Sequence, residues 1–488
     1  MKKQILITLT ILFSTSFAFA QNTIVFEKLY YTNDYPGVSC ARCVTQCNDG
    51  GYLLGGYATF GAWYDQKMLL LKVDSLGNEE WRKHYGEIPS SYNMIWDLQQ
   101  LQNGNIICCG SGSFIDGSSN DLKPRNSIII CVDSVGNMLW YNEANLGQKE
   151  EFNNLVINDN KVICSGWAKN PPTKDYAKPI LGICNTNGEE LNSRTLDIDN
   201  TENDMFVRSI CNLSYSKNAI VGDYGSKSFL CTINNQGDTI QTKIIGNDSP
   251  SQQTLYDITF IDGEIICCGL INDNIIDNAH NAYFAKYDNS LNIISDFWYP
   301  FENEEEIMFA KKVVAEANGD FIVAGVIGTP DRNWETWIKK HNSNNEILWE
   351  KCIGYETGSD EIQHLIKTAD GGYAILVFFN NYDGPSAISL IKIDKNGNGN
   401  YSSPVLTISN SLNYVNVYPN PASNNCYIEF SDHLASDYIE IYNLTGVLVL
   451  RSKIETNKQN LNISQLKSGL YIITDEKRSF TKKLIINN

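Results

Sequence analysis

One block of sequence recurs about seven times between residues 31 and 400, and this repeat restricts the fold more than any other feature of the chain. Each copy has a polar turn, an apolar strand ending in glycine, a variable loop, a second apolar strand, a tight turn, and a third strand that often carries Trp. The first strand occurs in segments 48–56, 103–110, 262–269, 318–325 and 369–376. In the second half of the block, residues 70–81 match residues 129–140, and the turn glycines fall roughly 50 to 60 residues apart.

A repeat of this length with three or four short strands predicts the blades of a β-propeller. One blade cannot bury both faces of its sheet, so blades stack side by side around an axis. The last block lacks its outer strand, while the chain begins with an extra strand at residues 23–30 that is similar to residues 349–353. We therefore expect an all-β propeller of about seven blades in residues 21–400, closed by its N-terminal strand. A β-sandwich array or a β-solenoid is the alternative.

The spacing between turn glycine and tryptophan, as in Gly77 to Trp81 and Gly136 to Trp140, resembles the tryptophan-docking motif of quinoprotein-type propellers. In that motif the Trp packs between neighbouring blades, and the resemblance implies the same packing here. The glycine stands one residue nearer the Asp than in the motif. More generally, the blocks resemble the loosely conserved propeller repeats of exported proteins.

The first twenty residues have the features of a secretory signal peptide. Lys2 and Lys3 form a positive start, residues 5–13 are apolar, and Ala18-Phe19-Ala20 fits a cleavage site. Cleavage after Ala20 exposes Gln21 and no Cys, so we expect no lipid anchor. No later apolar run reaches the roughly 20 residues of a membrane helix.

The net charge of −18 excludes some partners. Both ends of the chain are slightly positive, so the excess of acidic residues lies in the repeat region. Such a charge repels phosphate backbones and anionic bilayers. We expect no nucleic-acid binding, whereas cations, basic proteins and neutral glycans stay open as ligands.

After a linker at residues 401–412, residues 413–488 predict a small antiparallel β-sandwich with an Ig-like fold. Its segments closely resemble the type A C-terminal sorting domain of the type IX secretion system. The matching positions are the opening Tyr418-Pro419-Asn420-Pro421, the hairpin from Ile441 to Gly446, the strand pair with Leu466, Ser468, Gly469, Tyr471 and Ile473, and the ending Lys482-Lys483-Leu484-Ile485-Ile486. The resemblance implies passage through the periplasm and across the outer membrane. It also implies that a sortase-like peptidase removes the domain and that the product is secreted or attached to the cell surface.

The 14 cysteines fit two interpretations. Exported proteins often contain disulfides, but many of these cysteines end apolar strands, where they suit small buried hydrophobic positions. The cluster Cys40, Cys43 and Cys47 lacks the His of a haem motif and a fourth zinc ligand. We interpret it as a local disulfide or as buried strand residues. The adjacent pairs Cys108-Cys109 and Cys267-Cys268 repeat with the blades, which favours a core role over a site beside a quinone.

Other candidate sites are weaker. Residues 394–399 fit the start of an EF-hand loop, but Val405 stands where the bidentate Glu is needed. Asp74-Ser75-Leu76 and Asp133-Ser134-Val135 resemble O-glycosylation acceptors of these secretors, although turn chemistry also explains them. No G-x-S-x-G, H-E-x-x-H or P-loop pattern is present. We therefore predict no metal and no cofactor, and no catalytic residue is identified.

These features favour a non-enzymatic secreted or surface propeller that binds a glycan, a protein or a surface. Its ligand platform would be the variable loops, such as residues 111–126 and 169–178. The alternative is an exported polysaccharide hydrolase or lyase with acidic residues at the centre of the propeller. A structural role in surface adhesion and motility is a third hypothesis.

Overall fold

A computed structural model describes the chain at residues 24–31, 39–60, 66–86, 92–112, 125–144, 146–147, 149–169, 176–198, 203–246, 252–272, 280–299, 307–328, 334–355, 358–380, 386–401, 416–429, 438–443, 447–454, 456, 458–475 and 481–487. The chain divides into two compact units, residues 1–402 and 403–488. Within the described residues, no helix has the length and apolar character to cross a membrane.

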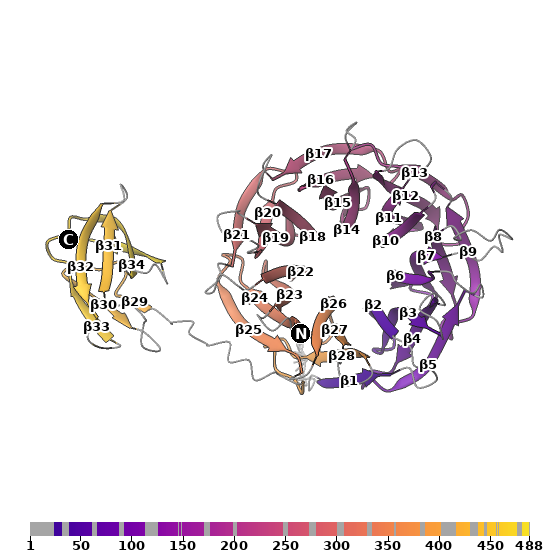
Figure 1. Ribbon diagram of the computed structural model, residues 1–488, viewed down its shortest axis with the longest axis horizontal. Coiled ribbons are helices and arrows are strands. Elements are labelled where there is room, and N and C mark those ends of the chain that lie inside the picture. The colour runs from indigo at the N-terminus through magenta and orange to yellow at the C-terminus, as the bar shows by residue number, and fades with distance from the viewer. Residues whose placement is uncertain are drawn as a thin grey trace, which may run out of the picture. The chain divides into compact units, whose positions relative to one another are not determined.

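The first unit is a β-propeller whose described residues form seven four-stranded antiparallel sheets around a central axis (Figure 1). The first four blades, each from the innermost strand outward, are β2 (Ser39–Gln46), β3 (Tyr52–Thr59), β4 (Gln66–Val73) and β5 (Glu79–Tyr85); β6 (Met94–Gln100), β7 (Ile106–Gly112), β8 (Asn126–Val132) and β9 (Met138–Ala144); β10 (Lys149–Asn158), β11 (Lys161–Lys169), β12 (Ala177–Asn185) and β13 (Asn192–Thr195); and β14 (Met205–Ser214), β15 (Lys217–Tyr224), β16 (Lys227–Asn234) and β17 (Thr239–Ile245).

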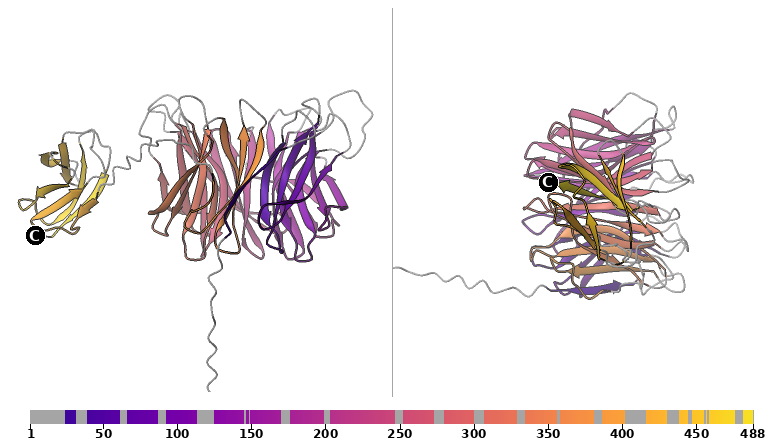
Figure 2. Two further views of the ribbon diagram at one scale, coloured as in Figure 1. Left: turned by 90° about the horizontal axis from the view of Figure 1, so that it is seen from below. Right: turned by 90° about the vertical axis from the view of Figure 1, so that its left-hand side faces the viewer.

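The last three blades follow the same order. They are β18 (Gln252–Ile261), β19 (Glu264–Asn272), β20 (Asn281–Tyr287) and β21 (Ile293–Trp298); β22 (Ile307–Ala315), β23 (Phe321–Gly328), β24 (Trp334–His341) and β25 (Ile347–Ile353); and β26 (Ser359–Lys367), β27 (Tyr373–Asn380), β28 (Ala387–Ile393) and β1 (Phe26–Tyr30). Figure 2 shows the strands running between the two ends of the propeller. The predicted seven-bladed propeller is confirmed.

The N-terminal strand closes the ring, as predicted. β1 pairs antiparallel with β28, the third strand of blade 7, with Tyr30 opposite Ile388. On its other side, the Tyr30 hydroxyl donates a 2.8 Å hydrogen bond to the Gly77 carbonyl of blade 1. The start of the chain therefore joins the first and last blades.

The tryptophan-docking resemblance is confirmed between several blades. Trp81 of blade 1 lies against Gly136 of blade 2, Trp140 against Gly188 of blade 3, and Trp349 against Gly397 of blade 7. A Cβ atom at Gly136 would be only 3.0 Å from the Trp81 ring, so the close packing requires glycine. The same glycine has φ +83°, which a side chain rarely tolerates. One residue thus serves both the turn and the contact between blades.

The second unit packs two antiparallel sheets against each other. The three-stranded sheet contains β29 (Asn416–Tyr418), β30 (Asn425–Glu429) and β33 (Lys458–Asn462). The four-stranded sheet has the order β32 (Leu448–Lys453), β31 (Tyr438–Asn443), β34 (Gly469–Asp475) and β35 (Thr481–Ile486). Their shared core includes Cys426, Ile428, Ile441, Ile473 and Leu484. This arrangement confirms the predicted β-sandwich.

Candidate functional site

Each of the seven innermost strands contains a β-bulge at the same place in its pairing with the second strand of the blade. A bulge leaves one residue unpaired and re-aims its side chain. We call the seven bulged residues the channel ring; they are Arg42, Trp96, Asn153, Arg208, Tyr256, Lys311 and Gln363. The ring has a different side chain in nearly every blade, and none is aliphatic.

The residues that flank each bulge are uniform by contrast. The residue before it is always apolar and buried, as Ala41 and Ile95 show in the first two blades, and so is the residue two positions after it, as Val44 and Leu98 show. Scaffold positions therefore repeat, while the channel ring varies. A position that a repeat leaves free to vary, on a rigid frame around an axis, is suited to ligand recognition.

Ring residues from neighbouring blades contact one another. The Arg42 guanidinium donates a 2.6 Å hydrogen bond to Gln363 Oε1 of blade 7 and lies 5.2 Å from the Trp96 ring centroid of blade 2. Arg208 lies over the Tyr256 ring at 5.7 Å and donates from Nε to Asp223 Oδ2 at 2.8 Å. The contacts of Arg42 and the contact of Arg208 with Tyr256 link separate blades around the channel, while Asp223 belongs to the same blade as Arg208.

Aromatic rings occupy the channel side of blades 1 to 5. We call this group the aromatic arc; its members are Tyr57, Trp96, Trp167, Phe206 and Tyr256. Trp167 meets Phe206 edge to face, with centroids 5.3 Å apart. Blades 6 and 7 also carry aromatic residues at matching positions, Phe309 at the place of Phe206 and Phe378 at the place of Trp167, beside the ion pair of Lys311 with Glu361. Aromatic and charged side chains are thus interspersed around the channel.

Glu151 holds the centre of the arc in position. Its carboxylate accepts hydrogen bonds from Trp167 Nε1 at 2.8 Å and from Trp96 Nε1 at 3.2 Å, and it forms an ion pair with Arg125. The side chain of Glu151 is 7% exposed. These three donors orient the two indole rings and satisfy the carboxylate.

The residue after each bulge is polar in most blades and binds the next blade. Asp97 accepts the Leu155 N–H at 2.9 Å, and Asp257 accepts both the Val313 N–H at 3.0 Å and the Ser209 hydroxyl at 2.6 Å. Burial raises the pKa of Asp97 to about 6. These partly buried carboxylates therefore hold inner strands together.

His364 occupies the same position in blade 7. It is hydrogen-bonded to the backbone of Val44 in blade 1. Burial, with Lys312 nearby as a smaller cause, lowers the pKa of His364 to about 3. A histidine that is neutral at all physiological pH values serves here as a link between the last and first blades.

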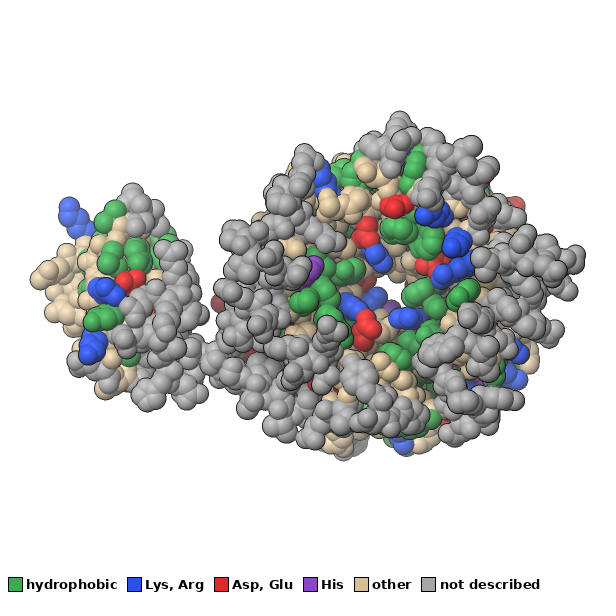
Figure 3. Space-filling view, viewed as in Figure 1, with side chains coloured by type: hydrophobic (Ala, Val, Ile, Leu, Met, Phe, Trp, Pro, Cys, Tyr) green, Lys and Arg blue, Asp and Glu red, His purple; other side chains and the backbone are tan. Residues whose placement is uncertain are grey.

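The central opening carries charges of both signs, as Figure 3 shows for the end that faces the viewer. Arg42, Arg208 and Lys311 stand beside Asp223 and Glu361. The hydrolase alternative expected acidic residues to gather at this centre. Among the described residues, Arg208 pairs there with Asp223 and Lys311 with Glu361, whereas the Arg42 guanidinium contacts Gln363 and the Trp96 ring.

Some buried polar atoms of this region have no hydrogen-bond partner in the structure. They are a donor, Arg42 Nε, and two acceptors, Asn153 Oδ1 and Asp223 Oδ1. Buried polar groups are normally satisfied by protein, water or ligand. These three atoms lie below the surface of the protein and are not themselves open to a ligand in the channel.

The predicted sorting motif is distributed over both sheets of the second unit. Asn420 Oδ1 accepts the Ile485 N–H at 2.8 Å, and the Ala422 N–H donates to the Ile485 carbonyl at 2.8 Å. Tyr418 donates to Glu429 Oε2 at 2.7 Å, and the buried Tyr471 donates to the Lys467 carbonyl at 2.9 Å. The opening of the motif thus binds the last strand of the domain.

The other predicted motif residues have simpler placements. Pro419 and Pro421 each follow a cis peptide bond. Gly469 pairs with Ile486, Lys482 with Ile473, and Lys483 with Ile472. Gly446 lies outside the described residues, as do the signal cleavage residues Ala20 and Gln21 and most of the variable loops 111–126 and 169–178.

The cysteines are thiols, and all but Cys211 and Cys352 are buried. Of the two interpretations, the structure supports the one in which the cysteines are buried core residues. Cys40, Cys43 and Cys47 are buried, and Cys43 and Cys47 belong to a core cluster between blades. Among the described residues, no group of three or more His, Cys, Asp or Glu is arranged to hold a metal ion.

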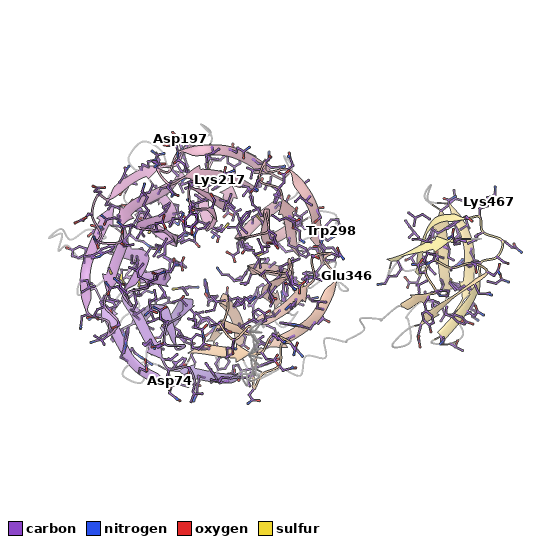
Figure 4. All side chains as sticks on the ribbon, turned by 180° about the vertical axis from the view of Figure 1, so that it is seen from behind. Asp74, Asp197, Lys217, Trp298, Glu346 and Lys467 are labelled. Carbon is purple, nitrogen blue, oxygen red and sulfur yellow. The ribbon has the colours of Figure 1, made fainter. Side chains whose placement is uncertain are left out.

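The EF-hand-like segment is an ordinary turn of the repeat. Asp394 Oδ1 accepts the N–H groups of Asn396 and Asn398 at 2.8 and 2.7 Å, and its Oδ2 accepts the Asn398 amide at 3.1 Å. Asp74, labelled at the edge of the propeller in Figure 4, makes the same three bonds in blade 1. The carboxylate is therefore used by the turn itself.

Sequence reasoning missed the channel ring, although a signal was present. Each inner strand breaks the alternation of apolar residues by placing two other residues between apolar ones, as in Ile95-Trp96-Asp97-Leu98. Aligning the blocks on this break would have identified the bulged positions.

Comparisons with known proteins bear on the second unit and on the fold. A family model described as "Secretion system C-terminal sorting domain" matches residues 416–487. No curated protein matches the chain.

Solved structures with related architecture are distant. A puromycin hydrolase S511A mutant matches with a TM-score of 0.42 and 11% identity over 70% of this chain and 50% of its own, so this chain spans half of that protein. Prolyl oligopeptidase B from Galerina marginata has a TM-score of 0.44 and 10% identity, over 93% and 56% of the two chains. PorZ, a surface component of the type-IX secretion system of Porphyromonas gingivalis, has a TM-score of 0.25 and 9% identity over 92% and 81%. At these TM-scores and sequence identities, the solved structures support no conclusion about the ligand or activity of this chain.

Proposed function

Because residues 416–487 form a type IX secretion system C-terminal sorting domain, which directs export to the cell surface or the medium, we propose that the chain is an exported, non-enzymatic propeller that binds a neutral glycan at its central channel. The observation that carries this proposal is the channel ring together with the aromatic arc. Small-ligand sites combine aromatic walls with a few placed polar groups.

Three features favour a neutral, hydroxyl-rich ligand. Sugar rings present flat C–H faces that pack on aromatic rings such as Trp96 and Tyr256, which lie at the channel. Hydroxyls both donate and accept hydrogen bonds, which matches the mixture of donors and acceptors in the channel ring, such as Arg42, Asn153 and Gln363. Two of the three basic side chains beside the arc, Arg208 and Lys311, are already paired with carboxylates, so a charged ligand gains little from them.

The hydrolase or lyase alternative receives no support from the carboxylates of this region. Glycoside cleavage needs a carboxyl pair open to the sugar. Glu151, Asp97 and Asp257 each accept bonds from the protein, and Asp223 and Glu361 are paired with cations. A binding role is the better account of this arrangement.

The proposed export route adds two processing steps. A signal peptidase cleaves after Ala20, and a sortase-like peptidase then removes the sorting domain. The N- and C-terminal sequences of the secreted product test both steps, with Gln21 as the expected first residue. A secreted product that retains residues 416–487 would contradict the second step.

A glycan array with the purified mature chain tests the binding function, followed by calorimetry with any glycan that binds. We expect neutral glycans to bind, and Trp96→Ala and Tyr256→Ala each to weaken binding at least ~10-fold, equivalent to about 1.4 kcal/mol. The control is Trp298→Ala, an exposed tryptophan on the outer strand β21, labelled at the edge of the propeller in Figure 4. Absence of any glycan ligand at millimolar concentration, or equal losses in all three variants, would overturn the proposal.

A further inference from the structure

The four-stranded sheet of the sorting domain carries apolar side chains on both faces. Its inward face packs against the three-stranded sheet, and Ile439, Ile441 and Ile473 there are fully buried. Antiparallel sheets with one face in the core normally turn polar residues outward. Here the outward positions of β31, β32, β34 and β35 also carry apolar side chains.

Strand register makes these outward side chains neighbours. Tyr442 pairs with Leu448 on one side and with Ile472 on the other, and Leu470 pairs with Ile485. We call these five residues the outward apolar face. Leu448, Ile472 and Ile485 are 42%, 39% and 38% exposed. Figure 3 shows hydrophobic side chains grouped on this unit, with charged side chains beside them.

The charges beside the outward apolar face are predominantly basic. Arg451 and Lys453 are exposed on β32, opposite Glu440 and Tyr438. Glu440 is only 8% exposed, accepts the Tyr442 hydroxyl at 2.6 Å and lies 3.3 Å from Arg451 Nε. This carboxylate balances the charge of Arg451, so the net positive charge on β32 comes from Lys453. The surface therefore offers an apolar centre with a positive edge.

Two of the five residues of the outward apolar face, Tyr442 and Ile485, are fixed positions of the sorting pattern. Tyr471 and Ile473 are buried, and Asn420 ties the opening of the domain to β35. Other pattern positions thus build the fold, while Leu448, Leu470 and Ile472, which are not pattern positions, point outward beside Tyr442 and Ile485. Recognition by a partner must use what the fold leaves accessible.

We propose that the outward apolar face is the docking surface for a component of the type IX secretion machinery, one that presents an apolar patch bordered by carboxylates. This inference rests on the proposed export through the sorting domain. Exposed apolar patches with a polar edge mark interaction sites. A second copy of this domain is a poor occupant, because it would bring two positive edges together.

The test uses the full chain in a bacterium with a working type IX system, with medium, cell surface and periplasm assayed separately. Ile472→Lys and Leu448→Lys should each lower export at least ~10-fold, with the protein accumulating in the periplasm. Tyr427→Lys is the matched control, since Tyr427 is 37% exposed on the other sheet, and it should be exported normally. Normal export of both face variants would overturn the proposal.

Two further variants separate folding and export from docking. Arg451→Glu leaves the apolar core untouched and should also lower export, and trypsin resistance of each purified variant shows whether the sorting domain is folded. Truncation after Asn410 should abolish export altogether. If the truncated chain is still secreted, the export assignment itself fails. If only the truncated chain is trapped, the docking face alone is wrong.

Discussion

The energetic effect of the contact between Trp81 and Gly136 can be measured by comparison with Gly371. This second turn glycine has the same φ, and no atom lies near the position of its absent Cβ. Gly136 and Gly371 both have φ +83°, and both follow a turn in which the glycine N–H donates to a carbonyl three residues earlier, at 3.0 and 2.9 Å. A Cβ atom at Gly136 would lie 2.8 Å from Lys83 Cγ and 3.0 Å from the Trp81 ring. At Gly371 nothing lies within 4 Å.

Alanine at either position has the cost of a left-handed backbone, about 1–2 kcal/mol. Gly136→Ala adds overpacking between two blades, typically about 1–3 kcal/mol. We therefore expect Gly371→Ala to lower the free energy of unfolding by about 1–2 kcal/mol and Gly136→Ala by about 2–5 kcal/mol. Trp81→Ala should relieve only the overpacking, not the cost of the left-handed backbone. The double variant Trp81→Ala/Gly136→Ala should therefore lose less stability than the sum of the losses of the two single variants.

Urea unfolding followed by tryptophan fluorescence measures these losses. All nine tryptophans precede residue 350, so the signal reports the propeller and not the sorting domain. Equal losses for Gly136→Ala and Gly371→Ala, within about 0.5 kcal/mol, would show that the Trp81 contact does not restrict this position and would refute the docking argument.

Three further predictions concern the links between strands and blades. Asp370→Asn should lower the free energy of unfolding by about 2 kcal/mol, because it removes the charged partner that lies 3.0 Å from Lys392, a side chain that is 1% exposed. Asp49→Asn should lower the free energy of unfolding less, because Lys72 still pairs with Glu80 at 2.8 Å. The pKa of His364 in the folded protein, about 3, lies below its ordinary value of 6.5. The neutral side chain therefore contributes to the free energy of unfolding above pH 6.5, and this contribution is lost as the pH falls towards 3. Between pH 7.5 and pH 5, wild type should lose about 2 kcal/mol relative to His364→Gln, and parallel urea curves at the two pH values would contradict this. Tyr30→Phe and Tyr85→Phe should each cost about 1 kcal/mol in the same assay, because each hydroxyl bonds a turn glycine of the next blade at 2.8 Å; no loss for Tyr30→Phe would argue against the lock at the N-terminal strand.

The sequence carried most of the information needed to predict the scaffold. A strand needs only a short apolar run, and a turn needs only its glycine, so the repeat could be seen without knowing any distance. The N-terminal strand was recognisable because the last block lacked an equivalent one. The sorting domain was recognisable because its pattern positions, such as Tyr471 and Asn420, are the ones that build its fold.

The channel ring was not predictable in the same way. Its members are separated by about 50 residues along the chain, as expected for equivalent positions in successive blades, and no local pattern says that Arg42 will reach Gln363. Each bulge changes the direction of a side chain through its pairing with the second strand, which is a tertiary property of the blade. The polar residues beside the ring also have partners in other blades, as Asp97 has in Leu155.

The sequence by itself therefore determined the blades, their order, the closing strand and the exported end of the chain, because each depends on short-range patterns that repeat or match a family. Only the tertiary structure decided what faces the channel and which face of the sorting domain is uncovered. Both depend on side chains from distant segments meeting around an axis or across a sheet. The physical reason is that ring closure and strand register, not local preference, bring Trp96 near Arg42 and Ile472 beside Tyr442.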